Sequence, residues 1–497
     1  MQAGHSACPT HEEPRKGKQP GAMRDRMSKR AVITLAVMIG MWLGGWERLY
    51  AAVERPLSSQ VSEQMWERLL TAGTPPLLRV AGDNLRAGHL LLQFYTRRLY
   101  WPAWSNDAGL LPQIDSLLKA LHEAEIEGLQ SRDYHLARLE SLLTELQQQS
   151  QAAPLNAAAL ADLDLLLTDA LLTYGAHLLY GRYGRVAPRI ANMMFDTSQE
   201  KIDVVDVLQR GLEANRLAEA LQSLLPHHPD YARLRQALAR YRQTPGAETQ
   251  VRQIALNMER WRWLPQDLGP RYILVDVPAY TLDIVERDQS VMRMRVVVGK
   301  PSWPTPVLSA TMSYIVLNPD WRVPPNIAAR ELVPILRANP GYLAQNNMRL
   351  SNGSHEVDPR SVDWSQVSTK NFPYRLRQEP GPKNPLGTIK FMFPNRFQVY
   401  LHDTPSRTLF AKPERAFSHG CIRVEKPMDL AEYALRGVLS RERIAAGLGR
   451  RTSRTVSLAE PLPTYLVYRT VLVKDDGTIQ FRPDIYGYDA LREGGAS

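Results

Sequence analysis

The sequence predicts an α+β multidomain protein in which an N-terminal all-helical scaffold precedes a β-sandwich domain with an inserted, mainly helical cap. Three patterns support this fold class. Before residue 225, apolar residues recur at spacings of three and four, which is typical of helices. From residue 271, they alternate with polar residues in short runs, which is typical of strands. Between residues 322 and 380, helical pieces and Pro-containing loops interrupt the strand pattern, so this stretch is predicted to be an insertion.

The chain begins with a segment that has the pattern of an export signal. Residues 23–30 are basic, residues 31–46 form an apolar run, and the small residues Ala51 and Ala52 follow. This order is typical of a secretory signal peptide, and the run is short for a membrane span of roughly 20 residues. We therefore expect residues 1–52 to be a signal peptide or, if uncut, an inner-membrane anchor, and the rest of the chain to lie outside the cytoplasm.

Residues 53–258 are predicted to be a helical scaffold domain followed by a charged helical connector. Clusters rich in residues that break helices, such as WPAWSNDAG, separate its amphipathic segments. The clearest segments are residues 85–99, 111–125, 136–148 and 157–179. Their apolar stripes read as helix core, and no residue pattern in this half indicates catalysis.

Residues 259–490 are predicted to be the β domain. The strand signals lie at residues 271–300, 311–317, 388–393, 397–402 and 465–481. A meander of this kind needs a second layer to bury its apolar face, which indicates a sandwich or a barrel. Long insertions such as residues 322–380 usually serve as lids or binding loops, so we interpret this one as a cap. Residues 491–497 form a C-terminal tail.

Charge and cysteine content narrow the function. The formal net charge is +10, but the basic residues are spread along the chain without a nucleic-acid-binding motif, so we expect no nucleic-acid partner. The chain has two cysteines, and Cys8 precedes the export segment. Cys421 therefore has no partner for an internal disulfide in the exported part. A lone thiol there is either a buried structural cysteine or a nucleophile, and its neighbours His419 and Gly420 favour the nucleophile.

A thiol attacks as the thiolate, so Cys421 needs a base near it. His402 ends a predicted strand and can approach from across the sheet, which makes it our candidate base. His419, two residues before the thiol, is the alternative. Gly420 permits a tight turn at this point, and the N–H groups of Gly420 and Cys421 are candidate oxyanion-hole donors, with the Tyr400 hydroxyl as a further donor.

Four more residues are candidates for substrate contacts. Arg423 either binds a substrate carboxylate, raises the local positive potential or forms an ordinary salt bridge. Ser418 belongs to the same turn as the thiol. Asp403 follows the candidate base and can orient it through its side chain or, as we expect, its backbone carbonyl. Trp321, at the start of the cap, is a candidate contact between cap and substrate.

Other interpretations of these residues remain open. A zinc site could be built from His402, Asp403, His419 and Cys421, although a lone thiol after Ser-His-Gly is better explained as a nucleophile. A redox role lacks a CxxC motif or a resolving cysteine. A non-catalytic envelope scaffold is the alternative from a different class of function. We expect neither a metal nor another cofactor.

The order of these residues along the chain resembles the signature of the L,D-transpeptidases with a YkuD-type catalytic domain. The family signature is a histidine, a spacer, Ser/Thr-His-Gly-Cys and then Arg or Asn two residues on. Here it reads His402, residues 403–417, SHGC at 418–421 and Arg423. Further segments resemble the large Gram-negative members of this family, in which a helical scaffold and a capping insertion accompany the catalytic domain. These segments are residues 167–182, 257–265, 318–336, 381–395, 399–410 and 481–489.

The resemblance covers about residues 85 to 490 and has one departure. Many such proteins carry a small peptidoglycan-binding module between scaffold and catalytic domain. The link between residues 231 and 258 is too short to hold it. Scaffold and cap would then have to anchor the substrate.

The resemblance implies a periplasmic enzyme that acts on peptidoglycan stem peptides. Cys421 would attack the carbonyl at the L-centre of diaminopimelate in a donor tetrapeptide, release D-alanine and form a thioester. The amine of an acceptor diaminopimelate would then produce a 3-3 cross-link, with His402 moving the protons. Water as acceptor would make the site an L,D-carboxypeptidase, and a protein lysine would tether an envelope protein. The resemblance also implies that carbapenems acylate Cys421 and that other cell-wall synthesis enzymes are partners.

Overall fold

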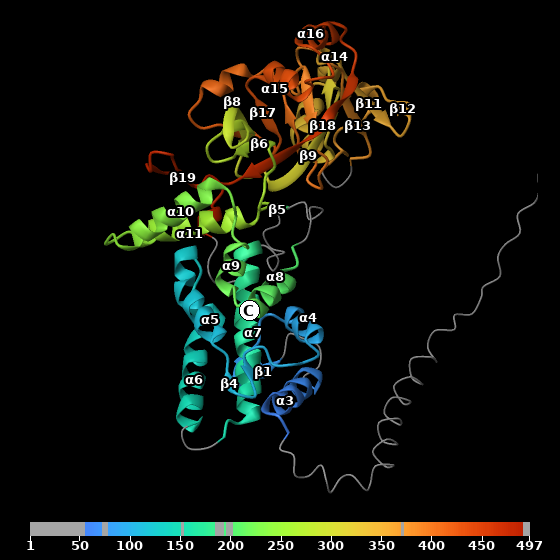
Figure 1. Cartoon of the computed structure of the whole chain (residues 1–497). Helices are drawn as coiled ribbons and strands as arrows, with labels where there is room; N and C mark the ends of the chain where they lie inside the picture. The colour runs from blue at the N-terminus through green and yellow to red at the C-terminus, as the bar shows by residue number, and fades with distance from the viewer. Residues whose placement is uncertain are drawn as a thin grey trace, which may run out of the picture.

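The computed structural model describes residues 55–71, 78–150, 154–183, 193–194, 202–368 and 372–490. The predicted export segment (1–52) and the tail (491–497) lie outside the described residues. The helical scaffold forms a column, helices α10 and α11 lie across its end, and the strand-rich domain lies beyond them (Figure 1). None of the helices in the described part of the chain combines the length and apolar character that a membrane crossing requires.

The scaffold is organised around helix α7 (Ala157–Tyr180), which is buried on nearly all sides. Its sequence is apolar around the whole helix, as expected for a helix surrounded by others. The other scaffold helices are α3 (Leu57–Thr71), α4 (His89–Arg97), α5 (Gln113–His122), α6 (Leu136–Ser150), α8 (Val204–Glu213) and α9 (Leu217–Gln222). Two short hairpins depart from the expected all-helical pattern: β1 (Arg79–Val80) with β2 (Asp83–Asn84), and β3 (Ser105–Asn106) with β4 (Gly109–Leu110).

A buried carboxylate on α7 ties a neighbouring loop to this central helix. Asp164 accepts hydrogen bonds from the backbone amides of Ala103 (3.0 Å) and Trp104 (2.9 Å) and from the hydroxyl of Tyr95 (2.6 Å). Burial raises the pKa of Asp164 to about 6. All its polar contacts are internal, which is how buried acids are tolerated, so Asp164 is a structural residue.

The strand-rich domain is one ten-stranded sheet in the order β14-β15-β17-β8-β7-β6-β18-β9-β5, with β16 paired to β8. Strand β14 also pairs with β9, so the sheet curls back on itself and encloses its core with a single sheet, where the predicted sandwich would have two layers. The strands are β5 (Met193–Met194), β6 (Arg271–Asp276), β7 (Thr281–Glu286), β8 (Gln289–Gly299), β9 (Val307–Leu317), β14 (Ile389–Met392), β15 (Leu401–His402), β16 (Ala416–Ser418), β17 (Ile422–Val424) and β18 (Arg454–Val467). Helices α15 (Pro427–Ala434) and α16 (Arg441–Gly449) follow β17.

The cap has a hydrophobic core of its own. Its elements are β10 (Trp321–Val323), α12 (Pro325–Ile327), the π-helical turn η3 (Ala328–Leu332), α13 (Val333–Ala338), α14 (Tyr342–Gln345), β11 (Met348–Asn352), β12 (His355–Glu356) and β13 (Arg375–Gln378). Trp364 is buried in this core, and its indole N–H donates to the Pro359 carbonyl (2.8 Å). The four strands form an antiparallel sheet that the helical pattern of the sequence does not predict.

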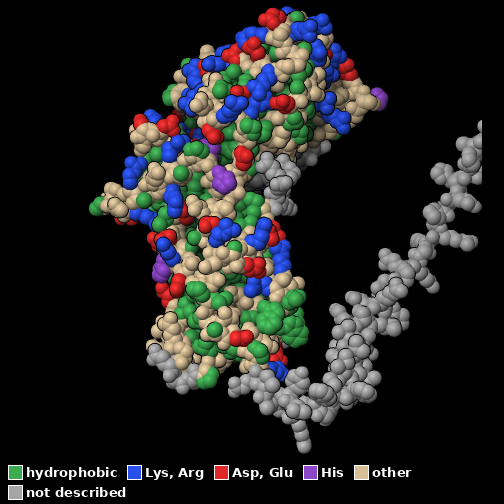
Figure 2. Space-filling view, viewed as in Figure 1, with side chains coloured by type: hydrophobic (Ala, Val, Ile, Leu, Met, Phe, Trp, Pro, Cys, Tyr) green, Lys and Arg blue, Asp and Glu red, His purple; other side chains and the backbone are tan. Residues whose placement is uncertain are grey.

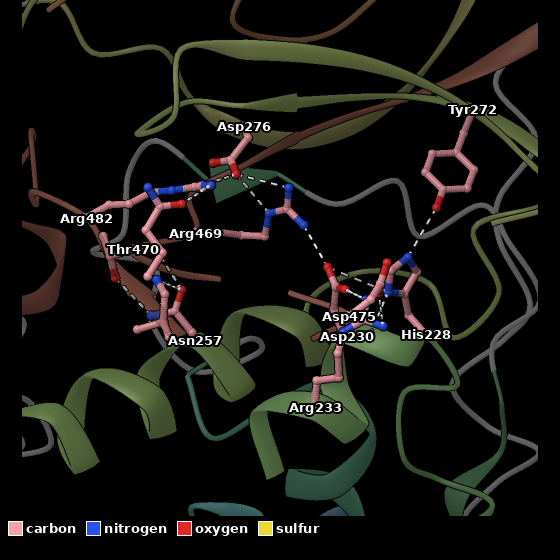
Figure 3. Close-up of polar contacts among 12 residues, drawn as sticks. His228, Asp230, Arg233, Asn257, Tyr272, Asp276, Arg469, Thr470, Asp475 and Arg482 are labelled. Carbon is pink, nitrogen blue, oxygen red and sulfur yellow. Dashed lines mark hydrogen bonds and ion pairs between the residues drawn. The ribbon is translucent and has the colours of Figure 1, made fainter. Parts of the chain in front are cut away.

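The connector helices pack on the sheet and share a core with it. Helices α10 (Pro229–Arg242) and α11 (Glu248–Arg262) lie against strands β6, β7 and β18 and the hairpin of β19 (Val471–Val473) and β20 (Ile479–Phe481). Beside this core lies the buried polar network of Figure 3, in which Arg469 binds Asp230 of α10 (2.8 Å) and Asp276 of β6 (3.0 Å). Arg482 also binds Asp276 (2.6 Å). Scaffold side and sheet are therefore joined by both apolar and ionic contacts.

On the face seen in Figure 2, basic and acidic side chains are intermixed over the strand-rich domain. This distribution agrees with the sequence, whose excess of positive charge is spread along the chain.

Candidate active site

The predicted nucleophile and base lie on neighbouring parallel strands. Strands β15 and β17 pair with Leu401 opposite Ile422 and His402 opposite Arg423. The Ile422 amide donates to the Tyr400 carbonyl (3.0 Å), so this register continues one residue back and sets Tyr400 beside Cys421. Side chains of paired residues point to the same face of a sheet, and so do residues two apart on one strand. The thiol, the phenol, the imidazole and the guanidinium therefore share one face.

The structure adds Lys390, which sequence reasoning missed. Strand β14 pairs with β15 so that Lys390 lies opposite His402. Its Nζ is 3.8 Å from the centroid of the Tyr400 ring. A row of Lys390, His402 and Arg423 thus crosses three adjacent strands. The alternation of IKF, with Ile389 and Phe391 buried, indicates that the lysine faces away from the core, but only the strand register shows what it faces.

His402 is buried and held in one orientation. Its Nδ1–H donates to the backbone carbonyl of Asp403 (2.5 Å), so Nε2 of the neutral ring carries no proton. Burial, with the positive charge of Arg423 and Lys390, lowers the pKa of His402 to about 3. The imidazole is therefore neutral in the resting site, as a base must be before it takes a proton.

The Asp403 side chain is not available to a substrate, in contrast to our expectation of a substrate-binding role. Its carboxylate accepts from the amide and hydroxyl of Thr388 (both 2.9 Å) and from Arg407 (3.2 Å). Gly387 packs against it, because a Cβ at this glycine would lie 2.4 Å from a carboxylate oxygen. Asp403 therefore fixes the strand end whose carbonyl orients His402.

The turn before the nucleophile differs from the expected oxyanion hole. The Ser418 hydroxyl donates to the Cys421 carbonyl (2.5 Å) and accepts from the Gly420 amide (3.1 Å). The Gly420 N–H is thus already bonded and is not a free oxyanion donor, and Ser418 is buried inside the turn and does not face a substrate. Gly420 has φ +105°, a left-handed conformation that glycine adopts without strain. The Cys421 amide has no hydrogen-bond partner among the residues that the structure describes, so it remains a candidate donor with the Tyr400 hydroxyl.

Two residues that the sequence did not single out support this turn. The buried Thr305 hydroxyl donates to the Gly420 carbonyl (2.8 Å) and accepts from the Gly299 amide (2.9 Å). The Tyr486 hydroxyl donates to the Gly299 carbonyl (2.6 Å) and accepts from the Thr305 amide (3.2 Å). Tyr486, from a distant part of the chain, therefore helps to hold the turn that carries Cys421.

Burial raises the pKa of the Cys421 thiol, whereas four neighbours lower it. These are the backbone amide and hydroxyl of Tyr400 and the charges of Lys390 and Arg423. Burial also raises the pKa of Tyr400, so its hydroxyl keeps its proton and can donate it in hydrogen bonds. Burial therefore favours the neutral forms of the thiol and of the imidazole.

His419 turns toward the cap. Its Nε2 lies 2.5 Å from a carboxylate oxygen of Glu331 in turn η3, and its ring meets the edge of Trp303 (5.4 Å between centroids). Trp321 packs partly against the core of the cap. Both residues lie at the cap, and His419 contacts it from the nucleophile turn, which fits His402 better as the base.

The Arg423 side chain has no hydrogen bond or ion pair within the described ranges, and its Nε is buried without a partner. An ordinary salt bridge, the alternative left open by the sequence, is therefore not found there. Within the same ranges no group of three or more His, Cys, Asp or Glu side chains is arranged to hold a metal ion.

Comparisons with known proteins agree with this geometry. Residues 89–238 match the family model of the Scaffold domain, and residues 270–444 match the YkuD family model, the L,D-transpeptidase catalytic domain. A Haemophilus influenzae protein named "Putative L,D-transpeptidase" is 31% identical over 441 residues, covering 86% of this chain and 84% of the relative.

Solved structures are matched less completely. An L,D-transpeptidase from Mycobacterium smegmatis matches with 14% identity and a TM-score of 0.19, over 40% of this chain and 58% of that one. L,D-transpeptidase 3 from Mycobacterium tuberculosis, with a faropenem-derived adduct, matches with 12% identity and a TM-score of 0.20, over 40% of this chain and 60% of that one. TM-scores this low carry no argument. On the full-length relative and the two family models, the chain belongs to the L,D-transpeptidase family, with a YkuD catalytic domain behind a Scaffold domain.

Proposed function

We propose that the protein is a cysteine-dependent peptidoglycan L,D-transpeptidase that forms 3-3 cross-links through a thioester on Cys421. The observation that carries this proposal is the pairing of β15 with β17. It sets Tyr400 beside Cys421 and places His402, whose Nδ1–H is bonded to the Asp403 carbonyl, on the same face. A thiol, an oriented neutral base and a phenol donor on one face are the parts of an acyl-transfer site.

In the first half-reaction the thiol proton passes to His402 Nε2 as the sulfur attacks the carbonyl at the L-centre of diaminopimelate. The Cys421 amide and the Tyr400 hydroxyl donate to the oxyanion. When the tetrahedral intermediate collapses, the C–N bond breaks and the D-alanine amine leaves with the proton that His402 carried. The donor stem remains bound to sulfur as a thioester.

In the second half-reaction an acceptor amine attacks the thioester. His402 takes a proton from this amine and returns it to the departing Cys421 sulfur, so the enzyme is restored. Water attacking at this stage would produce an L,D-carboxypeptidase, and a protein lysine would tether an envelope protein. The cap, held to the nucleophile turn by the Glu331–His419 contact, favours the amine because a lid excludes water from the thioester.

Arg423 is the candidate ligand for a substrate carboxylate. Stem peptides carry carboxylates next to the scissile bond, and a partly buried guanidinium without an acidic partner binds such a group strongly. In this proposal the protein acts in the periplasm on donor and acceptor stems, exported or anchored through residues 1–52, beside other cell-wall synthesis enzymes.

The test is to incubate the wild-type protein and a Cys421→Ala variant with a purified disaccharide-tetrapeptide that contains diaminopimelate. Mass spectrometry then follows both protein and muropeptides. Loss of D-alanine with a 3-3 linked dimer, in the wild type alone, is the expected result. Tripeptide without dimer would move the protein to the carboxypeptidase function, and products that persist in Cys421→Ala would remove the cysteine from the mechanism.

A further inference from the structure

Lys390 is a positively charged residue beside Tyr400, whose neighbour on the next strand is Cys421. On β14 it alternates with Ile389 and Phe391, whose side chains are buried in the core, so its own side chain lies on the face of the active site. Its Nζ lies over the face of the Tyr400 ring, 3.8 Å from the centroid. Within the described part of the chain the Lys390 ammonium forms no hydrogen bond and no ion pair with a carboxylate.

A Cys421 thiolate would need a positive charge near it, and His402 is poorly suited to supply that charge. In many cysteine enzymes the thiolate is stabilised by an imidazolium. Here the Nδ1–H of His402 donates to a neutral carbonyl, the ring is buried, and Arg423 lies opposite it on the next strand. A protonated His402 would have no carboxylate beside it and one guanidinium near it, so a lasting thiolate–imidazolium pair is unfavourable.

We propose that the Lys390 ammonium is the fixed positive partner of the Cys421 thiolate. The cation–π contact with Tyr400 holds the ammonium in place, and hydrogen bonds from Tyr400 also lower the pKa of the thiol. Lys390 would thus stabilise the charge that appears on sulfur before attack and again when the thioester is released. The proposal rests on Cys421 as the nucleophile and adds a charged residue to that site.

The electrostatics of the neighbouring groups support this pairing. Lys390 and Arg423 both lower the pKa of the thiol, and the effect of Lys390 is the larger. Both also lower the pKa of His402, and there the effect of Arg423 is the larger. Burial lowers the pKa of Lys390 itself, and the charges of Cys421 and Asp320 oppose this shift. Lys390 and Arg423 therefore both favour the thiolate, and the effect of Lys390 on the thiol is the larger of the two.

The test measures thiolate formation without any substrate. Iodoacetamide, which is uncharged, is reacted with the protein across pH 5.5 to 10, and alkylation of the Cys421 peptide is followed by mass spectrometry. The variants are Lys390→Met, Lys390→Arg and, as a matched control, Lys383→Met. Lys383 is an exposed lysine that, like Lys390, follows the cap in the sequence, and its Nζ donates to the Gln345 carbonyl.

Lys390→Met is expected to raise the apparent pKa for alkylation by about one unit, which makes alkylation about tenfold slower near neutral pH. Lys390→Arg, which keeps the charge, should stay within about threefold of the wild type, and Lys383→Met should match it. If Lys390→Met does not fold, as judged by circular dichroism, Lys390→Gln takes its place. An unchanged pH profile in the uncharged variant would overturn the proposal.

Two outcomes separate this proposal from its alternatives. If Lys390→Met has the wild-type alkylation profile but a raised KM for the tetrapeptide, Lys390 binds a substrate carboxylate and the thiolate proposal is wrong. If the profile shifts as expected but the wild type makes no peptidoglycan product, the thiolate proposal stands and the proposal that peptidoglycan is the substrate is wrong.

Discussion

The imidazole of His419 lies 2.5 Å from the Glu331 carboxylate, so the turn that presents the nucleophile is tied directly to the cap. Glu331 belongs to the π-helical turn η3, and Arg330 beside it lies over the Trp303 ring (5.6 Å) that His419 contacts edge-on. The cap is therefore held over the active site by contacts with a residue two positions from Cys421.

We expect Glu331→Gln to loosen the cap and to increase hydrolysis of the thioester relative to transfer. The pair is partly exposed, so the expected change in the ratio of tripeptide to dimer is modest, about two- to fivefold. Muropeptide analysis measures this ratio. Glu356→Gln, which removes an exposed carboxylate elsewhere in the cap, is the control and should leave the ratio unchanged. Equal ratios in all three proteins would show that the contact does not govern access of water.

His402→Ala should slow acylation of Cys421 by a carbapenem about 100-fold or more, because it removes the general base. His419→Ala should slow it only a few-fold, because His419 contacts the cap. Intact-protein mass spectrometry over time measures both rates. The reverse order of the two effects would make His419 the base.

Thr305→Val should destabilise the protein and slow acylation together. The valine leaves the Gly299 amide and the Gly420 carbonyl without their partner, and each buried unsatisfied group costs about 1–3 kcal/mol. Thr305→Ser keeps the hydroxyl and should recover most of the acylation rate. Thermal unfolding and carbapenem acylation measure the two effects, and a valine variant as active as the serine variant would remove Thr305 from the support of the turn.

Stability should fall as the pH falls below 6.5, because burial lowers the pKa of His177 to about 4 and that of His402 to about 3. The unfolded chain binds protons near pH 6.5, whereas the folded chain binds them only near these lower values, so stability is complete above 6.5 and is lost toward pH 4. His177→Gln should therefore reduce the loss between pH 7.5 and pH 5 by about 2 kcal/mol. Denaturant unfolding at the two pH values checks this, with the exposed His89→Gln as control. An identical loss in wild type and His177→Gln would contradict it.

The sequence predicts the parts of this molecule that have local signals. The spacing of His402 and the SHGC turn identifies the site, and the change from helical to alternating pattern near residue 271 agrees with the start of β6 at Arg271. The scaffold helices follow the same rule, since α7 begins at Ala157 where its apolar pattern begins.

Features that depend on strand register were not predictable in this way. Lys390 faces the active site because β14 pairs with β15, a contact between segments that no local pattern encodes. The Gly420 amide is bonded to Ser418, which only the geometry of the turn decides. The cap strands β11 and β13 (MRLSN and RLRQ) carry many polar residues and give a weak strand signal. Thr305 and Tyr486 reach the turn from distant parts of the chain.

The sheet also determines how this enzyme can be divided. Strand β18 lies between β6 and β9, beyond residue 444 where the match to the catalytic family model ends. Farther on, Tyr486 braces the nucleophile turn, and Asp489 binds Arg260 of α11 (2.6 Å). A gene fragment for residues 270–444 would therefore encode the signature residues without the strand that completes their sheet. Residues 270–444 alone are therefore not expected to form an active domain without the connector and the C-terminal segment.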